Sequence, residues 1–115
     1  SVPSQVISAM ISVMDVIDSD NIPDTYSLKQ NYPNPFNPIT TLKYGLPEDS
    51  FVNVNIYNLR GNVINNLVNK KQSSGFHSIS WNATNNLGQP VSAGMYIYTI
   101  KAGDFRETRK MILLK

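Results

Sequence analysis

The chain has 115 residues, no cysteine and a hydrophobic content of 41%, which is enough for one packed domain without disulfide bonds. No apolar run reaches the roughly 20 residues of a membrane-spanning helix, and the basic residues form no dense stripe with aromatics, which argues against a nucleic-acid partner. The net charge of +2 is divided unevenly: residues 1–28 carry four aspartates and no lysine or arginine, and residues 29–115 carry all ten basic residues and four acidic ones.

Residues 1–25 differ in pattern from the rest of the chain. Four apolar residues follow helical spacing: Ile7, Met10, Met14 and Ile17. Ile22-Pro23 ends the pattern, because proline disfavours helix at the residue before it. We therefore expect a short helix or a linker here. The chain does not begin with methionine, so we expect it to be a piece of a longer protein.

A proline- and asparagine-rich segment follows, here called the strap. Its defining residues are Asn31, Pro33, Asn34, Pro35, Phe36, Asn37 and Pro38. Because proline fixes its own φ and restricts the residue before it, the strap is expected to be extended, with a possible cis bond at Tyr32-Pro33. A polyproline II period of three places the three asparagines on one ridge. The strap is either a buttress along a sheet edge, which we favour, or a peptide ligand for an aromatic groove.

From residue 39 onward, short segments alternate between apolar and polar residues, which predicts strands. Six are expected: 41–46, 52–57, 63–68, 77–81, 95–101 and 105–114. A short seventh is expected near residues 26–29. Turns are predicted between them, including a polar loop at 70–74 and a hairpin at Asn58 to Gly61. This pattern predicts an all-β fold, an immunoglobulin-like antiparallel β-sandwich of about seven strands with a short N-terminal helical or linker segment.

No catalytic constellation stands out, and we expect neither enzyme activity nor a cofactor. His77 is the only histidine and lies in a strand pattern. Asp15, Asp18 and Asp20 lack the spacing of a calcium loop. Oxygens of Asn82 to Asn86 are a possible calcium site, although turn formation explains these residues more simply.

Exposed aromatic residues offer a second interpretation, a carbohydrate-binding or adhesion module. The candidate stacking residues are Tyr57, Trp81, Tyr96 and Tyr98. A tryptophan in a small β-sandwich more often lies in the core.

Several motifs occur in order: Tyr26 to Pro38, Tyr44-Gly45-Leu46-Pro47, Ile56 to Gly61, Gly75-Phe76-His77 before Trp81, Gly88 to Tyr98, and Lys110-Met111. Over about residues 26–115 this order resembles the type A C-terminal sorting domain of cargo of the type IX secretion system. It is also similar to the immunoglobulin-like domain of flagellar hook-capping proteins. Many members place Ser where Ala93 stands and Ala where Ser74 stands, both small-residue exchanges.

The resemblance implies a non-catalytic secretion signal at residues 26–115, with residues 1–25 linking it to an upstream cargo domain. The implied partner is the outer-membrane machinery of type IX secretion, and the implied route leads through the periplasm to the cell surface or outside. Cleavage after export is implied, loosely within residues 15–26. The residues implied in recognition are Gly94, Tyr96, Tyr98, Lys110, Met111 and Lys115. The oligomeric state is left open.

Overall fold

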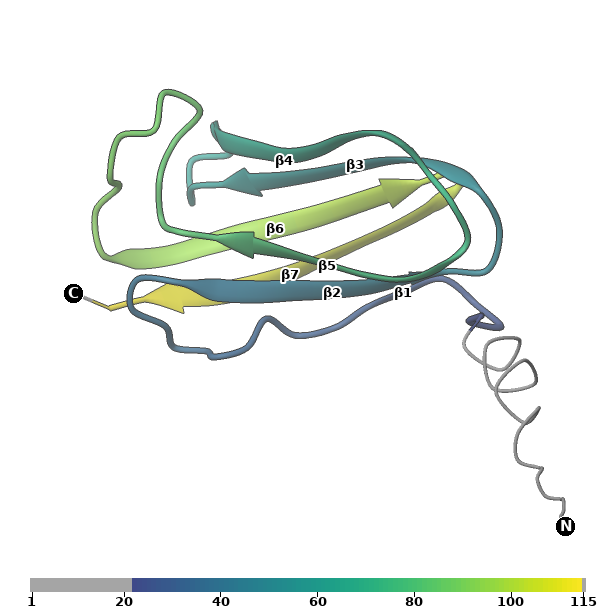
Figure 1. Cartoon of the computed structure of the whole chain (residues 1–115). Helices are drawn as coiled ribbons and strands as arrows, with labels where there is room; N and C mark the ends of the chain where they lie inside the picture. The colour runs from purple at the N-terminus through teal and green to yellow at the C-terminus, as the bar shows by residue number, and fades with distance from the viewer. Residues whose placement is uncertain (1–21, 115) are drawn as a thin grey trace, which may run out of the picture.

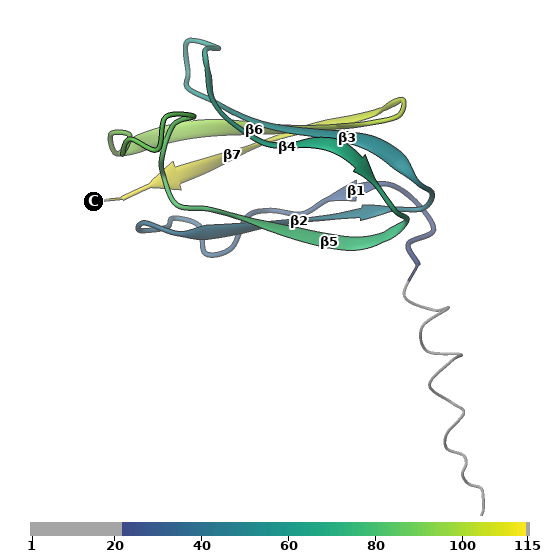
Figure 2. The same ribbon diagram turned by 45° about the horizontal axis from the view of Figure 1, so that its top comes forward.

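A computed structural model describes residues 22–114, and every regular element in that range is a β-strand. The strands are β1 (Ser27–Leu28), β2 (Thr40–Leu46), β3 (Ser50–Tyr57), β4 (Val63–Gln72), β5 (Gly75–Trp81), β6 (Gly94–Ala102) and β7 (Phe105–Leu113). One sheet has the order β1-β2-β5 and the other β4-β3-β6-β7, with all neighbours antiparallel. The two sheets pack face to face (Figures 1 and 2), which confirms the predicted sandwich.

The expected N-terminal helix or linker lies mainly outside the described residues. Residues 22–25, which are described, contain no helix. Across residues 22–114 no helix is long and apolar enough to cross a membrane.

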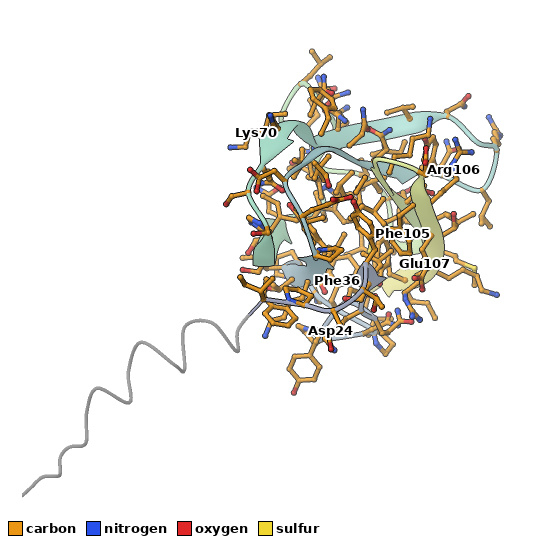
Figure 3. The ribbon with its side chains drawn as sticks, turned by 90° about the vertical axis from the view of Figure 1, so that its right-hand side faces the viewer. Asp24, Phe36, Lys70, Phe105, Arg106 and Glu107 are labelled. Atoms are coloured by element: carbon orange, nitrogen blue, oxygen red, sulfur yellow. The ribbon has the colours of Figure 1, made fainter. Side chains whose placement is uncertain are left out.

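The core lies between the sheets, and the alternation of the strands decides which residues enter it. On β3, Val52, Val54 and Ile56 are fully buried, because side chains along a strand point to opposite faces in turn. Trp81, at the end of β5, is 1% exposed and packs against the rings of Phe36 and Tyr96 at centroid distances of 5.8 and 5.4 Å. Figure 3 shows how side chains from both sheets fill the space between them.

The predicted polar loop at 70–74 is wrong in its first half. β4 continues to Gln72, because Lys70, Lys71 and Gln72 pair with the beginning of β3. One face of this part of the sheet is open to solvent, so polar side chains there are compatible with a strand. The connection to β5 therefore needs only Ser73 and Ser74.

The first described residues pack against the outer face of the three-stranded sheet at Gly45. A Cβ atom at this glycine would lie 2.9 Å from Ser27 Oγ and 3.0 Å from Pro23 Cγ. Both distances are shorter than an ordinary van der Waals contact, so the absence of a side chain lets the chain approach this closely. Gly45 therefore fixes where the chain enters the domain.

Candidate functional site

The strap runs along the edge of β7, which is the last strand of the four-stranded sheet. Phe36 N–H donates to Ile112 O at 3.0 Å, and Leu114 N–H donates to Phe36 O at 2.8 Å. The side chain of Asn34 accepts a third bond, from Ile112 N–H at 3.0 Å. Figure 1 shows the segment before β2 beside the C-terminal end of β7. These bonds confirm the buttress interpretation, since they satisfy backbone groups that an edge strand otherwise leaves open.

The predicted ridge of three equivalent asparagines is wrong. Asn31 is 2% exposed, whereas Asn34 and Asn37 are exposed. The Asn31 Nδ2 group donates to Thr40 Oγ1 at 3.0 Å and to Pro33 O at 3.2 Å, so its amide closes the loop internally. The three X–Pro bonds of the strap, before Pro33, Pro35 and Pro38, are cis.

A polar seam joins the residues before the strap to the four-stranded sheet. Tyr98 lies on β6, and its hydroxyl donates to Lys29 O at 2.9 Å and accepts from Asn31 N–H at 2.8 Å. Arg109 lies next to it on β7 and donates from Nε to Leu28 O at 2.7 Å. Since residues 28–31 belong to the opposite layer, these bonds hold the two sheets together along one side.

Burial raises the pKa of the Tyr98 hydroxyl above its ordinary value of 10.0, and its hydrogen bond with Asn31 lowers the pKa to a smaller extent. Burial likewise raises the pKa of Tyr44. In both cases folding favours the neutral phenol. The stabilisation is therefore fully present below the unfolded-state pKa of 10.0 and is lost as the pH rises through the higher folded-state pKa.

We expect the free energy of unfolding to decrease as the pH is raised above about 10. Urea titrations at a series of alkaline pH values measure this dependence. Tyr98→Phe removes one of the two phenols whose pKa burial raises, so its stability should decline less steeply over the same range. Equal slopes for the two proteins would contradict a role of Tyr98 in the decline.

The structure separates the residues implied in recognition into two groups. Gly94 and Lys110 are exposed, whereas Tyr96, Tyr98 and Met111 are at most 5% exposed and belong to the core. The alternation of β6 and β7 explains this, because residues 96, 98 and 111 share the inward face. The side chains of these three residues therefore lie inside the fold, where a partner molecule cannot contact them directly. Lys115 lies outside the described residues.

The outward face at the same end of the sheet carries an apolar surface, here called the terminal patch. Its residues are Tyr57, Val63, Met95, Ile97, Lys110 and Ile112, which are cross-strand neighbours. Val63 is 50% exposed, Met95 38% and Ile112 37%. A shallow groove of about 250 Å³, lined by residues 58–60 and 92–96, lies beside the patch. Exposed apolar clusters of this kind are typical of surfaces that contact other molecules.

The aromatic platform expected for sugar stacking is not formed. Trp81, Tyr96 and Tyr98 are buried, and only Tyr57 is partly exposed. Trp81 Nε1 donates to Thr84 O at 2.8 Å, and Tyr96 Oη donates to Ser92 O at 2.6 Å. Aromatic rings in a sandwich interior contribute packing area and polar anchors, which removes the basis of the carbohydrate interpretation.

His77 and the asparagine-rich connection have structural partners. The ring of His77 stacks on Tyr44 at 5.4 Å, and its Nε2 donates to Ser73 O at 2.8 Å. Asn85 Oδ1 accepts from Leu87 and Gln89 N–H, and Asn86 Oδ1 accepts from Asn66 N–H. These bonds support the turn interpretation. Within residues 22–114 no three His, Asp or Glu side chains lie close enough together to hold a metal ion.

Sequence reasoning missed the residues that make the terminal patch apolar. Met95, Ile97 and Ile112 alternate with the buried Tyr96, Tyr98 and Met111, so the pattern itself held the signal that a second apolar face exists. It also did not predict that Lys43 of β2 and Lys29, the residue after β1, lie side by side. Their proximity depends on how the strands pair.

Two solved structures that resemble this fold come from Porphyromonas gingivalis. A part of dimeric latent PorU from Porphyromonas gingivalis matches 80% of this chain with a TM-score of 0.61 and 23% identity. PorZ from the same organism, described as an essential bacterial surface component of the type-IX secretion system, matches 80% of the chain with a TM-score of 0.52 and 18% identity. This chain covers only 9% and 12% of those two chains, and at these identities the likeness establishes the fold.

No curated protein matches the sequence. A family model does: the FlgD Ig-like domain matches residues 38–104, which include β2 to β6 and the turn that leads to β7. The match spans more than half of the chain and agrees with the observed sandwich. The chain therefore belongs to the family of FlgD Ig-like domains.

Proposed function

We propose that this domain is a non-catalytic C-terminal secretion signal that directs an upstream protein of the same chain to the type IX outer-membrane machinery. The observation that carries the proposal is the fold shared over 80% of the chain with a part of PorZ, a surface component of that system. The ordered motifs from Tyr26 to Met111 add to it, since they occur in the strap and along strands of both sheets. The cargo would pass through the periplasm to the cell surface or the medium.

A signal that serves unrelated cargoes must be read from its own surface, which requires a self-contained fold. The terminal patch meets this requirement, because its apolar side chains and Lys110 come from strands of this domain alone. The strap covers β7 at Ile112 and Leu114, so addition of a partner strand at these positions is blocked. We therefore assign recognition to the outward side chains of β6 and β7. Cleavage between residues 15 and 26 would remove the signal after export.

The test is a fusion of all 115 residues to the C-terminus of a periplasmic reporter, expressed in a bacterium that has type IX secretion. We expect the fusion to reach the cell surface or the medium. Deletion of residues 105–115 should leave the reporter in the periplasm. Cell fractionation followed by immunoblotting measures the distribution.

Because the deletion also removes β7, a surface variant is needed. Lys110→Glu combined with Ile112→Asp alters the terminal patch, and Arg106→Glu combined with Thr108→Asp is the matched control on the same strand and face. Both pairs change the charge by the same amount. We expect only the first pair to stop export while both remain folded by circular dichroism. Equal export of the two variants would contradict recognition at the patch, and export of the deletion variant would indicate a structural spacer.

A further inference from the structure

Two lysines face each other on the outer surface of the three-stranded sheet. Lys29 follows β1 and donates its backbone N–H to Lys43 O on β2 at 2.9 Å, continuing the register that pairs Leu28 with Tyr44. Both side chains are exposed. Like charges directly opposite each other on antiparallel strands destabilise a sheet. Within residues 22–114 the ion pair that forms is between Arg109 and Glu107, and neither Lys29 nor Lys43 has an acidic partner there.

Grooves adjoin this lysine pair on both sides. One groove has a volume of about 350 Å³. Besides the two lysines it is lined by Tyr44 of β2 and by Phe76, His77 and Ser78 of β5. The other, also about 350 Å³, is lined by the same lysines with Gln30, Tyr32 and Thr41. Phe76 is 59% exposed and Tyr32 81% exposed. The surface thus combines two positive charges that lack an acidic partner within residues 22–114 with apolar rings. This combination suits an extended peptide that carries both carboxylates and apolar side chains.

The chain supplies such a segment next to this surface. Residues 15–20 contain Asp15, Asp18 and Asp20 interleaved with Val16 and Ile17, and residues 1–28 contain no basic residue. Residues 15–20 lie outside the described structure, but the point where the chain arrives is fixed, because Pro23 packs on Gly45. Lys43 lies two residues from Gly45 on the same face of β2, about 7 Å away along the strand.

The reach of the chain is sufficient. Asp20 lies three residues before Pro23 and Asp18 lies five before it, so extended chain allows about 10 and 17 Å respectively. Attachment to the same chain keeps the local concentration of these carboxylates high. The acidic side chains within residues 22–114 form no ion pair with Lys29 or Lys43, so they do not compete for these lysines.

We propose that the acidic segment of residues 15–20 docks on the groove formed around Lys29 and Lys43, with Asp18 and Asp20 neutralising the lysine pair. Docking would hold these residues, which come before the domain, against the three-stranded sheet. It extends beyond the proposed function, because it holds whether or not the domain acts as a secretion signal.

Zero-length carbodiimide cross-linking of the full chain, followed by peptide mass spectrometry, tests the proposal. The reagent joins carboxylates and amines that are in direct contact. We expect links from Asp18 or Asp20 to Lys29 or Lys43 to exceed links to the exposed control lysines Lys70 and Lys101 by several-fold. Strong salt should reduce them, since exposed ion pairs are screened. An even distribution over all lysines would overturn the proposal.

Cross-linking a mixture of unlabelled and ¹⁵N-labelled protein shows whether the carboxylate comes from the same chain as the lysine or from a second copy. Links confined to one isotope form support docking within the chain, and mixed links would overturn it in favour of a second copy. No link to Lys29 or Lys43 would leave the groove to an acidic partner from outside and would also overturn the proposal.

A second readout does not depend on cross-linking. Cleavage before aspartate in residues 15–20 by an aspartate-specific protease should be several-fold faster in Lys29→Gln/Lys43→Gln than in the unchanged protein. Lys29→Arg/Lys43→Arg should retain the slow rate, because it keeps both charges. Lys70→Gln/Lys71→Gln is the control for loss of positive charge elsewhere. Equal cleavage rates in all four proteins would contradict docking.

Discussion

Replacement of Phe36 by alanine is expected to lower the free energy of unfolding by about 3–5 kcal/mol, the usual cost of truncating a buried aromatic residue. Phe36 is 1% exposed and inserts its ring beside Trp81, although it belongs to the strap and not to a strand. Its backbone also holds Ile112 and Leu114. Urea denaturation, analysed as a two-state transition, measures the change.

Tyr32→Ala is the matched control for Phe36→Ala, because it truncates an aromatic residue of the same segment that is 81% exposed. It should change stability by no more than about 0.5 kcal/mol. Hydrogen exchange adds a local readout: the amide of Leu114 should exchange faster in Phe36→Ala than in Tyr32→Ala. Similar losses of stability in the two variants would contradict the anchoring role of Phe36.

Tyr98→Phe is expected to lower the free energy of unfolding by about 1–3 kcal/mol, because it leaves a buried donor without a partner. The tyrosine hydroxyl accepts from Asn31 N–H, and Asn31 is 2% exposed, so water has little access to the freed amide. The same substitution removes the bond to Lys29 O. Chemical denaturation at neutral pH measures the effect without interference from phenol ionisation.

The neighbouring Tyr96→Phe is the control, since Tyr96 points into the same core but makes a single bond, to Ser92 O at 2.6 Å. Loss of that bond should cost about 0.5–1.5 kcal/mol. A greater loss for Tyr96→Phe than for Tyr98→Phe would argue against the seam that joins Tyr98 to Lys29 and Asn31.

These two sites bear on where the domain can be recognised. The strap and the seam occupy one long side of the sandwich, where they close the end of β7 and connect the sheets. Substitutions there are expected to act through stability. The terminal patch is different, because Lys110 and Ile112 point away from the core and can be changed without opening it. This separation allows an export defect to be distinguished from a folding defect.

The amino-acid sequence by itself determined that the chain forms β-strands and, where apolar and polar residues alternate strictly, which face points inward. In β3, Val52, Val54 and Ile56 alternate with Asn53, Asn55 and Tyr57, and burial follows that alternation. A strand's period of two is a local property, so it can be read from a short segment. The turn at Gly61 was equally local, since its φ of 88° is a conformation that favours glycine.

The sequence was less reliable where polar residues belong to a strand. Lys70 and Lys71 suggested a loop, but their backbones pair with Val52 and Phe51. Pairing satisfies the backbone whatever the side chains are, provided that one face is open to water. The end of β4 was therefore decided by its partner strand and not by its own composition.

Only the tertiary structure decided which distant residues meet. Asn34 receives a hydrogen bond from Ile112, 78 positions away, and Phe36 contacts Trp81. The order of the strands in the two sheets likewise determined that Tyr96 and Tyr98 are core residues, that Met95 and Ile112 share an exposed face, and that Lys29 lies beside Lys43. Such pairings depend on the free energy of the whole chain, in which loop closure is weighed against the burial of both sheets, and no local period records that balance.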